Sequence, residues 1–489
     1  MSMISVHNLT FGYDGGINHV FENVSFNIDT DWRLGLIGRN GKGKTTFLKL
    51  LMDEYEYQGS IIKNVDFDYF PFDVENKTKM AIEIVNDIAP LAEDWEIIKE
   101  LSLLGTEADV LYRSFDCLSG GEQVKILLIS LFLKGKNFLL IDEPTNHLDS
   151  ETKENLVKYL KKKKGFILVS HDREFLDNTV DHIISINNTG IDIQKGNFSS
   201  WQENKDRQDN FELTQNEKLK KDIARLQTAA KNTSDWSDKT EKAKFGSGGN
   251  IDRGYIGHKS AKMMKKSKVM EKRIEKSIDE KSGLLNNIDR NDDLKIVPVY
   301  AKQNPLMTAS DFQVKYDDKA IFDKVSFEIK NGDRIAVVGK NGAGKSSILK
   351  LIMGEDIQYS GIVKVAGGLK ISYVPQSTDG LNGIVRERAQ QNDVDEAVFI
   401  TLLTKMGFTT EDFNKKTKDL SEGQKKKVLL AESISKSANI YVWDEPLNYV
   451  DILTRIQLEK AVLKYRPTLI FVEHDTQFVK HIANKTVQL

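Results

Sequence analysis

The sequence predicts an α/β protein in which two copies of one domain are joined by a long α-helical hairpin. The chain has 489 residues, which corresponds to two to four domains at about 100 to 200 residues each. A glycine-rich motif at Gly38–Thr45 recurs 301 residues later at Gly339–Ser346. Three further motifs recur at nearly the same separation, and the sequence between the copies is polar with apolar residues at helical spacing. We therefore expect the first copy at residues 1–203, a helical linker at residues 204–298 and the second copy at residues 299–489.

The composition excludes several classes of protein. Hydrophobic residues make up 39% of the chain and charged residues 29%, a balance typical of globular proteins. The densest apolar run, Ile126 to Leu133, is far shorter than the roughly 20 residues that span a bilayer. Cys117 is the single cysteine, and the first residues lack the pattern of a secretory signal, so we expect a cytoplasmic protein. The net charge of −2 means that nucleic-acid binding would need a local basic patch.

The two glycine-rich motifs have the pattern of phosphate-binding loops. Each follows an apolar run and so lies where a strand turns into a helix. Glycines let backbone N–H groups converge on phosphate oxygens, the lysine adds positive charge, and the next hydroxyl can bind Mg²⁺. A chance glycine-rich turn would explain one copy but not two. The candidate nucleotide-binding residues are Gly38, Asn40, Gly41, Gly43, Lys44, Thr45 and Thr46 in the first copy, and Gly339, Asn341, Gly342, Gly344, Lys345, Ser346 and Ser347 in the second.

Two acidic residues end an apolar, strand-like run in each copy. They are Asp142 and Glu143 after the first run, and Asp444 and Glu445 after the second. Acids at the carboxyl end of a buried parallel strand lie in the ligand crevice of an α/β sheet. The aspartates suit Mg²⁺, together with the hydroxyls of the loops, and the glutamates suit polarising a water molecule. An ordinary strand-end turn would explain one acid but not a matched pair in both copies.

The loop Leu118–Glu122 resembles the signature loop of ATP-binding cassette (ABC) ATPases, and this resemblance covers the whole chain. The stretch Asp142–Asp149 is similar to the hallmark stretch of the ABC-F branch. The proteins of this branch are soluble tandem cassettes that act on ribosomes. Within that branch, the linker run Gly254–Gly257 with Met263–Lys268 resembles the antibiotic-resistance factors of the Lsa, Vga and Sal type. The resemblance implies two P-loop NTPase domains, here called cassette 1 and cassette 2, that bind ATP and Mg²⁺ and hydrolyse ATP to ADP and phosphate.

The resemblance also implies that the cassettes of one monomer close head to tail around two ATP molecules. Site one would combine the cassette 1 loop with the second signature loop, and site two the cassette 2 loop with the first. Tyr13 and Tyr316 stand where the family stacks an aromatic ring on adenine, although packing at a strand end is the alternative. His171 and His474 resemble the catalytic switch histidine that contacts the γ-phosphate. The signature residues implied are Ser119, Gly120 and Gly121 in cassette 1, and Ser421, Gly423 and Gln424 in cassette 2.

Two departures from the family pattern distinguish the cassettes. Gln376 occupies the position where the family carries a glutamine that approaches Mg²⁺, whereas cassette 1 has Phe72 there. A phenyl ring cannot bind a metal, so the two sites are expected to hydrolyse ATP differently. The second signature loop carries Glu422 in place of a glycine, and phosphate would repel a carboxylate that pointed inward. We expect Glu422 to point away from the nucleotide.

The linker is predicted to be two antiparallel helices with a basic tip. Leu219, Ile223, Leu226 and Ala230 form one apolar stripe, and a glycine-rich break follows at residues 245–250. Between positions 242 and 268 eight basic residues stand against one acid, a pattern that suits RNA phosphates but is also that of an ordinary solvated helix. The candidate tip residues are Lys242, Lys244, Phe245, Arg253, Tyr255, Ile256, His258, Lys259, Lys262, Lys265 and Lys266.

By resemblance, the ATP-bound closed form would enter the tRNA exit site of the bacterial 70S ribosome, beside 23S rRNA and the P-site tRNA. The linker would then dislodge lincosamide, pleuromutilin or streptogramin A drugs from the peptidyl-transferase centre, and hydrolysis would release the factor. No membrane or DNA partner is expected. The alternatives are a general translation factor that acts on stalled ribosomes without a drug, the ATPase of an exporter, and a DNA-repair ATPase, which the lack of zinc-ligand cysteines disfavours.

Overall fold

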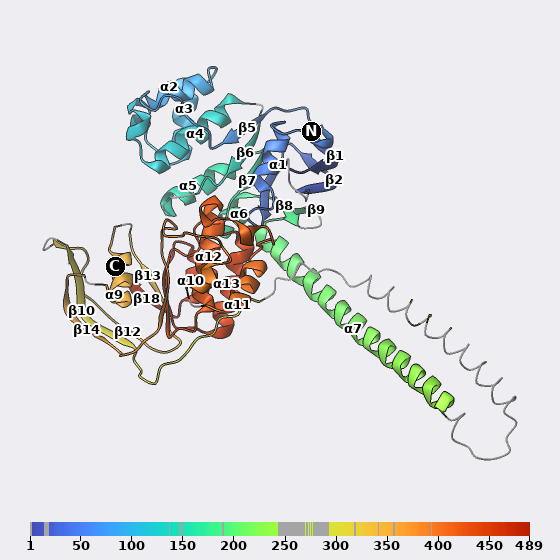
Figure 1. Ribbon diagram of the computed structural model, residues 1–489. Coiled ribbons are helices and arrows are strands. Elements are labelled where there is room, and N and C mark those ends of the chain that lie inside the picture. Colours follow the sequence, from blue (N-terminus) through green and yellow to red (C-terminus); the bar gives the residue numbers. More distant parts are fainter. Residues whose placement is uncertain are drawn as a thin grey trace, which may run out of the picture. The chain divides into compact units, whose positions relative to one another are not determined.

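The structure of the chain is a computed structural model. It describes residues 2–13, 19–135, 137–145, 148, 150–187, 190–242, 269, 272, 274, 276, 293–316, 319–340, 342–355, 357–392 and 394–489. The chain divides into two compact units (Figure 1), of which the first comprises Met1–Ser199 and Asn291–Leu489 and the second Ser200–Arg290. Among the helices described, none has the length and apolar character needed to cross a membrane.

Cassette 1 contains a mainly parallel sheet and a separate antiparallel sheet. The strands are β1 (Met3–Phe11), β2 (Phe21–Asp29), β3 (Arg33–Gly38), β4 (Gln58–Ile62), β5 (Phe67–Phe70), β6 (Phe138–Asp142), β7 (Phe166–Val169), β8 (His182–Asn187) and β9 (Gly190–Lys195). The helices are α1 (Lys44–Leu51), α2 (Ala81–Ile88), α3 (Asp94–Leu103), α4 (Gly120–Lys134), α5 (Ser150–Leu160) and α6 (Arg173–Thr179), with 3₁₀ turns at Ala108–Tyr112 and Phe115–Cys117. The main sheet has the order β5-β6-β7-β3-β8-β9, and the antiparallel sheet has the order β2-β1-β4.

Cassette 2 repeats this architecture. Its strands are β10 (Met307–Tyr316), β11 (Lys319–Ala320), β12 (Val325–Ile329), β13 (Arg334–Val338), β14 (Tyr359–Val365), β15 (Ile371–Val374), β16 (Ile440–Asp444), β17 (Leu469–Val472) and β18 (Lys485–Gln488). Its helices are α9 (Lys345–Met353), α10 (Arg388–Gln391), α11 (Glu396–Lys405), α12 (Glu422–Ser435), α13 (Ile452–Tyr465) and α14 (Thr476–Ile482), with 3₁₀ turns at Asp412–Asn414 and Thr417–Asp419. The parallel sheet has the order β15-β16-β17-β13-β18, which matches β5-β6-β7-β3-β8.

The order of the strands brings the predicted site residues to one edge of each parallel sheet. In cassette 1, β6 pairs with β7 and β7 pairs with β3, all in parallel. The carboxyl ends of the three strands therefore lie at the same edge of the sheet. Asp142 ends β6, Ser170 follows β7 and Gly38 ends β3. The same parallel pairing joins β16, β17 and β13 in cassette 2. The strands are buried on both faces, which explains their continuous apolar sequences.

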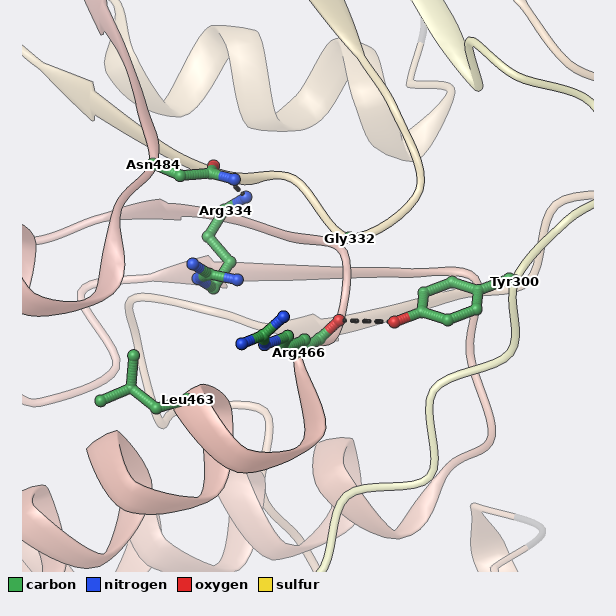
Figure 2. Close-up of a pocket in the computed structure, with 6 residues that line it drawn as sticks. All are labelled: Tyr300, Gly332, Arg334, Leu463, Arg466 and Asn484. Carbon is green, nitrogen blue, oxygen red and sulfur yellow. Dashed lines mark hydrogen bonds between the residues drawn. The ribbon is translucent and has the colours of Figure 1, made fainter.

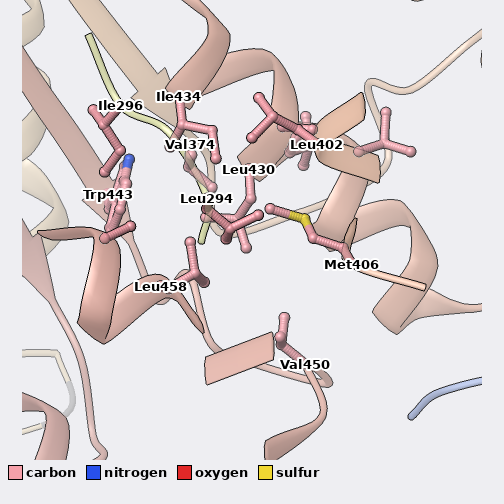
Figure 3. Close-up of a cluster of buried hydrophobic side chains, with 14 of the residues drawn as sticks. Leu294, Ile296, Val374, Leu402, Met406, Leu430, Ile434, Trp443, Val450 and Leu458 are labelled. Carbon is pink, nitrogen blue, oxygen red and sulfur yellow. The ribbon is translucent and has the colours of Figure 1, made fainter. Parts of the chain in front are cut away.

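The core of cassette 2 includes the segment that leads into it from the linker. Leu294 and Ile296 are buried in one cluster with Trp443 of β16 and Leu430 of α12 (Figure 3). Trp443 is fully buried, and its indole N–H donates to Ser433 Oγ at 3.1 Å. Because these contacts begin before residue 299, the structural core of cassette 2 extends several residues upstream of the boundary that we expected from the sequence.

The second unit contains the first linker helix. Helix α7 (Phe198–Lys242) has 45 residues, which at a rise of about 1.5 Å per residue gives a length of roughly 67 Å. Leu219, Ile223 and Leu226 of the predicted stripe are partly buried, whereas Lys218 and Lys220 are exposed. Of the second half of the predicted hairpin, only positions 269, 272, 274 and 276 are described, and they are helical. The predicted tip from Lys244 to Lys266 lies outside the described residues, as does the side chain of Lys242.

Candidate nucleotide-binding sites

The two glycine-rich loops have the same local geometry. Gly43 and Gly344 immediately precede α1 and α9 and have left-handed φ angles of 92° and 86°. A Cβ at Gly43 would also lie 2.6 Å from Val20 Cγ1, so glycine is required there. Lys44 Nζ donates to the carbonyl oxygen of Gly38 at 2.9 Å, and Lys345 Nζ donates to that of Gly339 at the same distance. Each loop thus wraps around its own lysine. Asn341 lies outside the described residues.

The acids of cassette 1 lie beside the first loop. Asp142 Oδ2 accepts hydrogen bonds from Thr45 Oγ1 at 3.3 Å and from the Tyr69 hydroxyl at 2.9 Å. Burial raises the pKa of Asp142, although the bond from Tyr69 and the charge of Lys44 oppose the shift. An aspartate and a hydroxyl at this separation are the donors that Mg²⁺ takes in P-loop sites. Tyr69 is an additional partner that the sequence did not predict.

The acids of cassette 2 also fit a divalent cation. Asp444 is 3% exposed, and among the described residues its Oδ1 has no hydrogen-bond partner. Such an atom is costly to bury unless a ligand or ion satisfies it. Burial raises the pKa of Asp444, and a hydrogen bond from Ser346 and the charge of Lys345 partly offset this. Asp444 and Ser346 would therefore hold Mg²⁺ at site two, with Gln376 on the neighbouring loop.

The two glutamates differ in their surroundings. Both have left-handed backbones, with φ of 51° at Glu143 and 46° at Glu445, a conformation that non-glycine residues retain chiefly at functional sites. Burial and the adjacent Asp142 raise the pKa of Glu143 to about 8. His474, followed by Gln376 and Asn448, lowers the pKa of Glu445 to about 2 despite its partial burial. At neutral pH Glu445 is therefore ionised, whereas Glu143 is largely protonated.

Each switch histidine lies next to the glutamate of its own cassette. His171 Nε2 is 3.4 Å from Glu143 Oε1, and His474 Nε2 is 3.6 Å from Glu445 Oε1. Burial, with the nearby positive charges of Lys44 and Arg455, holds the pKa of His171 well below its usual value. His171 is consequently neutral and can accept or donate a hydrogen bond at neutral pH.

The structure assembles site one across the two cassettes. Asn40 Nδ2 in the first loop donates to the carbonyl oxygen of Tyr449 at 2.7 Å. A Cβ at Gly423 would lie only 2.2 Å from Asn40 Nδ2, so the second signature loop is in direct contact with the first phosphate-binding loop. Ser421 begins α12 with a capping box, in which its Oγ accepts from the Gln424 N–H at 3.3 Å. The first phosphate-binding loop and the second signature loop, which were expected to share site one, thus lie together across this junction.

Several residues of this junction were not predicted. Asp451 is fully buried and forms an ion pair of 2.5 Å with the equally buried Lys427. Its Oδ2 also accepts from the Asn40 N–H at 3.4 Å. The charges of Lys427 and Lys44 keep the pKa of Asp451 far below its usual range despite complete burial. Asp451 stands at the position equivalent to Asp149 in the quoted stretch of cassette 1, a correspondence that could have revealed it.

At site two, the described residues show no matching contact between the cassettes. Gly121 faces Leu148 and Thr152 of its own cassette, and no heavy atom of the described residues lies within 4 Å of a Cβ placed at Gly120 or Gly342. Within the described part of the chain, Ser119 bonds its capping partner Glu122 rather than the Lys345 loop. The described residues, which do not include His147, Asp149 or Asn341, therefore show the closure implied by the family resemblance at site one alone.

A buried ion pair joins the two cassettes on one side of the junction. The guanidinium of Arg173, at the start of α6, binds both carboxylate oxygens of Glu459 on α13, and the two side chains are 6% and 9% exposed. The equivalent positions on the other side are Thr476 and Val157, which cannot form an ion pair. Thr476 instead donates to Glu174 Oε2 at 2.8 Å. The buried ion pair thus has no counterpart on the other side, where a hydrogen bond from Thr476 to Glu174 joins the cassettes.

The remaining predicted residues are placed as follows. The ring of Tyr13 is 50% exposed, and its hydroxyl lies 2.6 Å from Thr46 Oγ1. The side chain of Tyr316 lies outside the described residues. Glu422 points away from the first loop, as expected: Thr378 Oγ1 donates to its Oε2 at 2.6 Å.

A pocket on cassette 2 lies apart from these residues. It has a volume of about 620 Å³ and is lined by Tyr300, Gly332, Arg334, Leu463, Arg466 and Asn484 (Figure 2). The equivalent of Arg334 in cassette 1, Arg33, is paired with Asp181 at 2.9 Å. Asn484 takes the place of that aspartate, so the lining is basic and contains no carboxylate. None of the predicted site residues belongs to it.

Replacing Gly423 by alanine tests the junction at site one. The added methyl group would overlap Asn40 Nδ2, and overpacking of this kind costs about 1–3 kcal/mol. We expect Gly423→Ala to weaken the binding of a fluorescent ATP analogue by on the order of tenfold or more. Gly367→Ala is the matched control, because a Cβ there meets no heavy atom within 4 Å. Equal affinities of the two variants would contradict the assembled site.

The comparisons with known proteins agree with this geometry. A family model described as "ABC transporter" matches residues 21–146 and 322–448. The ATP-binding protein Uup of Buchnera aphidicola (subsp. Acyrthosiphon pisum) is 31% identical, with 99% of this chain and 80% of Uup covered. ABC transporter F family member 2 of Arabidopsis thaliana is 25% identical over all of this chain and 76% of its own. The chain belongs to the ABC-F family. Its two cassettes are therefore ATP-binding domains, which implies ATPase activity.

A further relative of this ABC-F chain has a name that states its function. The ribosome protection protein VmlR of Bacillus subtilis is 27% identical, with 95% of this chain and 83% of VmlR covered. Among solved structures, the archaeal ribosome recycling factor aABCE1 has a TM-score of 0.59 at 19% identity, covering 98% of this chain and 87% of that chain. The RNase-L inhibitor has a TM-score of 0.58 at 18% identity, covering 99% and 87%. These structures confirm the predicted fold class of tandem cassettes.

Proposed function

We propose that this ABC-F chain hydrolyses ATP at its two cassettes and uses the cycle to bind and leave the bacterial 70S ribosome, protecting it from drugs of the peptidyl-transferase centre. The observation that carries the proposal is the similarity to VmlR, which extends over 95% of this chain and so includes the linker. The drugs would be lincosamides, pleuromutilins or streptogramin A. The protein would act in the cytoplasm as a monomer.

Each predicted side chain has a task in hydrolysis. Lys44 and Lys345 would bind the β- and γ-phosphates of ATP, and Tyr13 and Tyr316 would stack on adenine. Thr45 with Asp142, and Ser346 with Asp444 and Gln376, would hold Mg²⁺, which neutralises charge on the phosphates when it is bound. Glu445 is ionised and 3.6 Å from His474, so it is suited to accept a proton from the attacking water. Glu143 and His171 occupy the equivalent positions at site one, where the raised pKa of Glu143 makes it less suited to accept the proton.

ATP would control binding to the ribosome through the junction of the cassettes. A ligand shifts an equilibrium only by its difference in affinity for the two states. ATP between Lys44 and the Ser421–Gln424 loop would stabilise the closed junction, and the closed form would enter the exit site. The basic tip from Lys242 to Lys266 would then contact 23S rRNA and disturb the drug site. Hydrolysis would open the junction and release the factor.

Drug susceptibility combined with ribosome sedimentation tests this function. We expect a sensitive bacterial strain that expresses the chain to tolerate lincosamides or pleuromutilins. Replacing Lys259, Lys262 and Lys265 by serine should abolish resistance. The matched control replaces Lys218, Lys220 and Lys221 on α7, which are exposed, and removes the same charge. Resistance that is equal in both triple variants would show that the tip is not the effector.

A translation factor that acts on stalled ribosomes without a drug is the second candidate. Uup has a higher identity to this chain than VmlR, at 31% against 27%, and its name mentions no protection from drugs. A chain that sediments with 70S ribosomes in the presence of ATP but gives no resistance would favour this candidate. A chain that does not sediment with ribosomes would overturn both.

A further inference from the structure

Helix α12 connects the two nucleotide sites within cassette 2. Its first turn carries the signature loop that contacts site one, where Gly423 lies against Asn40. One turn later the same helix carries Lys426, which is 1% exposed. Gly423 and Lys426 are three positions apart and therefore lie on one face of this helix. A movement of the signature loop along the helix axis would also move Lys426.

Lys426 binds the loop that serves site two. Its Nζ donates to the carbonyl oxygens of Pro375 at 2.8 Å, Gln376 at 3.1 Å and Asp444 at 3.2 Å. An ammonium group has three donors, and here all three are used on backbone atoms next to the proposed Mg²⁺ ligands. Removing the ammonium would leave three carbonyl oxygens without this donor, and for the buried bond to Asp444 this loss is unfavourable.

Glu422 provides a second connection to the same loop. Its Oε2 accepts from Thr378 Oγ1 at 2.6 Å, and its Oε1 accepts from Lys425 Nζ at 2.7 Å. Thr378 lies two residues after Gln376. The carboxylate that departs from the family pattern therefore joins the signature loop at site one to the glutamine loop at site two.

Cassette 1 lacks both connections. The positions equivalent to Glu422 and Lys426 are Gly120 and Val124, and Phe72 stands in place of Gln376. Neither a glycine nor a valine can donate or accept a side-chain hydrogen bond. Glu422 and Lys426 thus connect the signature loop at site one to the glutamine loop of site two. Gly120 and Val124 cannot connect the signature loop at site two to site one in this way.

We propose that Glu422 and Lys426 are positioning residues that couple the two ATP sites: when the Ser421–Gln424 loop closes on ATP at site one, they set Gln376 and Asp444 for hydrolysis at site two. This inference rests on the proposed hydrolysis of ATP by both cassettes. Because the connection is one-sided, occupancy of site one controls turnover at site two more than the reverse. Such asymmetry is allowed for kcat, although binding affinities remain reciprocal.

Turnover at site two can be measured by itself in a Glu143→Gln background. There, preventing ATP binding at site one by Lys44→Ala should lower kcat by on the order of tenfold, which is within the usual range of coupling between sites. In the same background, Lys426→Met and Glu422→Gly should each lower kcat with little change in KM. Each should also reduce the effect of Lys44→Ala to within about twofold. A structural role alone would not remove this response.

Controls separate the possible outcomes. Val124→Met makes a similar change at the matching helix position of cassette 1 and should leave the response to Lys44→Ala intact. Glu422 is an exposed residue, so Glu422→Gly keeps the test valid if Lys426→Met does not fold. A tenfold response that persists in both variants would overturn the coupling while leaving ATP hydrolysis established. A wild-type chain without ATPase activity would overturn the proposed function and this inference together.

Discussion

Replacing Glu445 by glutamine is expected to lower the ATPase rate of the chain by about 10²- to 10⁴-fold, the usual contribution of a general base. Glu445 is ionised because His474, Gln376 and Asn448 surround it and lower its pKa to about 2. The amide of glutamine keeps the shape of the side chain but cannot accept the proton. Steady-state phosphate release at saturating ATP, with binding of a fluorescent ATP analogue as a check, measures the effect.

The matching change at site one should have a much smaller effect. Burial raises the pKa of Glu143 to about 8, so this side chain is largely uncharged at neutral pH. Site one also has Phe72 at the position where site two has Gln376. We expect Glu143→Gln to retain most of the turnover and the Glu143→Gln, Glu445→Gln double variant to bind ATP without hydrolysing it. Equal losses in the two single variants would show that the sites work alike.

The second large effect is expected at the junction of the cassettes. Arg173→Met leaves the carboxylate of Glu459 buried without its partner, and breaking a buried ion pair in this way costs about 3–5 kcal/mol. His481, 3.6 Å from Glu459, cannot replace the two bonds that the guanidinium makes. Urea denaturation, followed by tryptophan fluorescence, measures the change in the free energy of unfolding.

A double-mutant cycle distinguishes the pair from general loss of packing. Arg173→Met with Glu459→Leu removes both charges and should recover most of the stability, because well-packed apolar residues commonly replace a buried pair without loss. Arg33→Met is the control, since its partner Asp181 is 37% exposed and can bind water instead. If Arg173→Met were no more destabilising than Arg33→Met, the pair would not hold the junction.

The sequence predicted those parts of the site that each cassette forms within itself. The loops around Lys44 and Lys345 and the acids at the ends of β6 and β16 follow from local strand–loop–helix patterns, and the order of the parallel strands brings them together. Asymmetry between the sites was also expected from Phe72. Sequence patterns do not report burial, however, and the opposite pKa shifts of Glu143 and Glu445 depend on it.

The contacts between the cassettes could not be predicted in the same way. Arg173 and Glu459 are 286 residues apart, and no local pattern relates them. A comparison of the two copies, position by position, would have shown that Thr476 and Val157 cannot form the same pair. The hydrogen bond from Tyr69 to Asp142 has no counterpart in the described residues of cassette 2, where burial raises the pKa of the equivalent Tyr373 to about 12.

The ion pair between Arg173 and Glu459 joins two cassettes of one polypeptide. The junction should therefore respond to dilution differently from an interface between separate subunits. Association of separate subunits depends on their concentration, whereas halves that share a chain meet at a constant effective concentration. A desolvated pair is also screened little by salt. The closed junction should therefore persist on dilution, and ATPase activity per molecule should stay constant from micromolar to nanomolar protein.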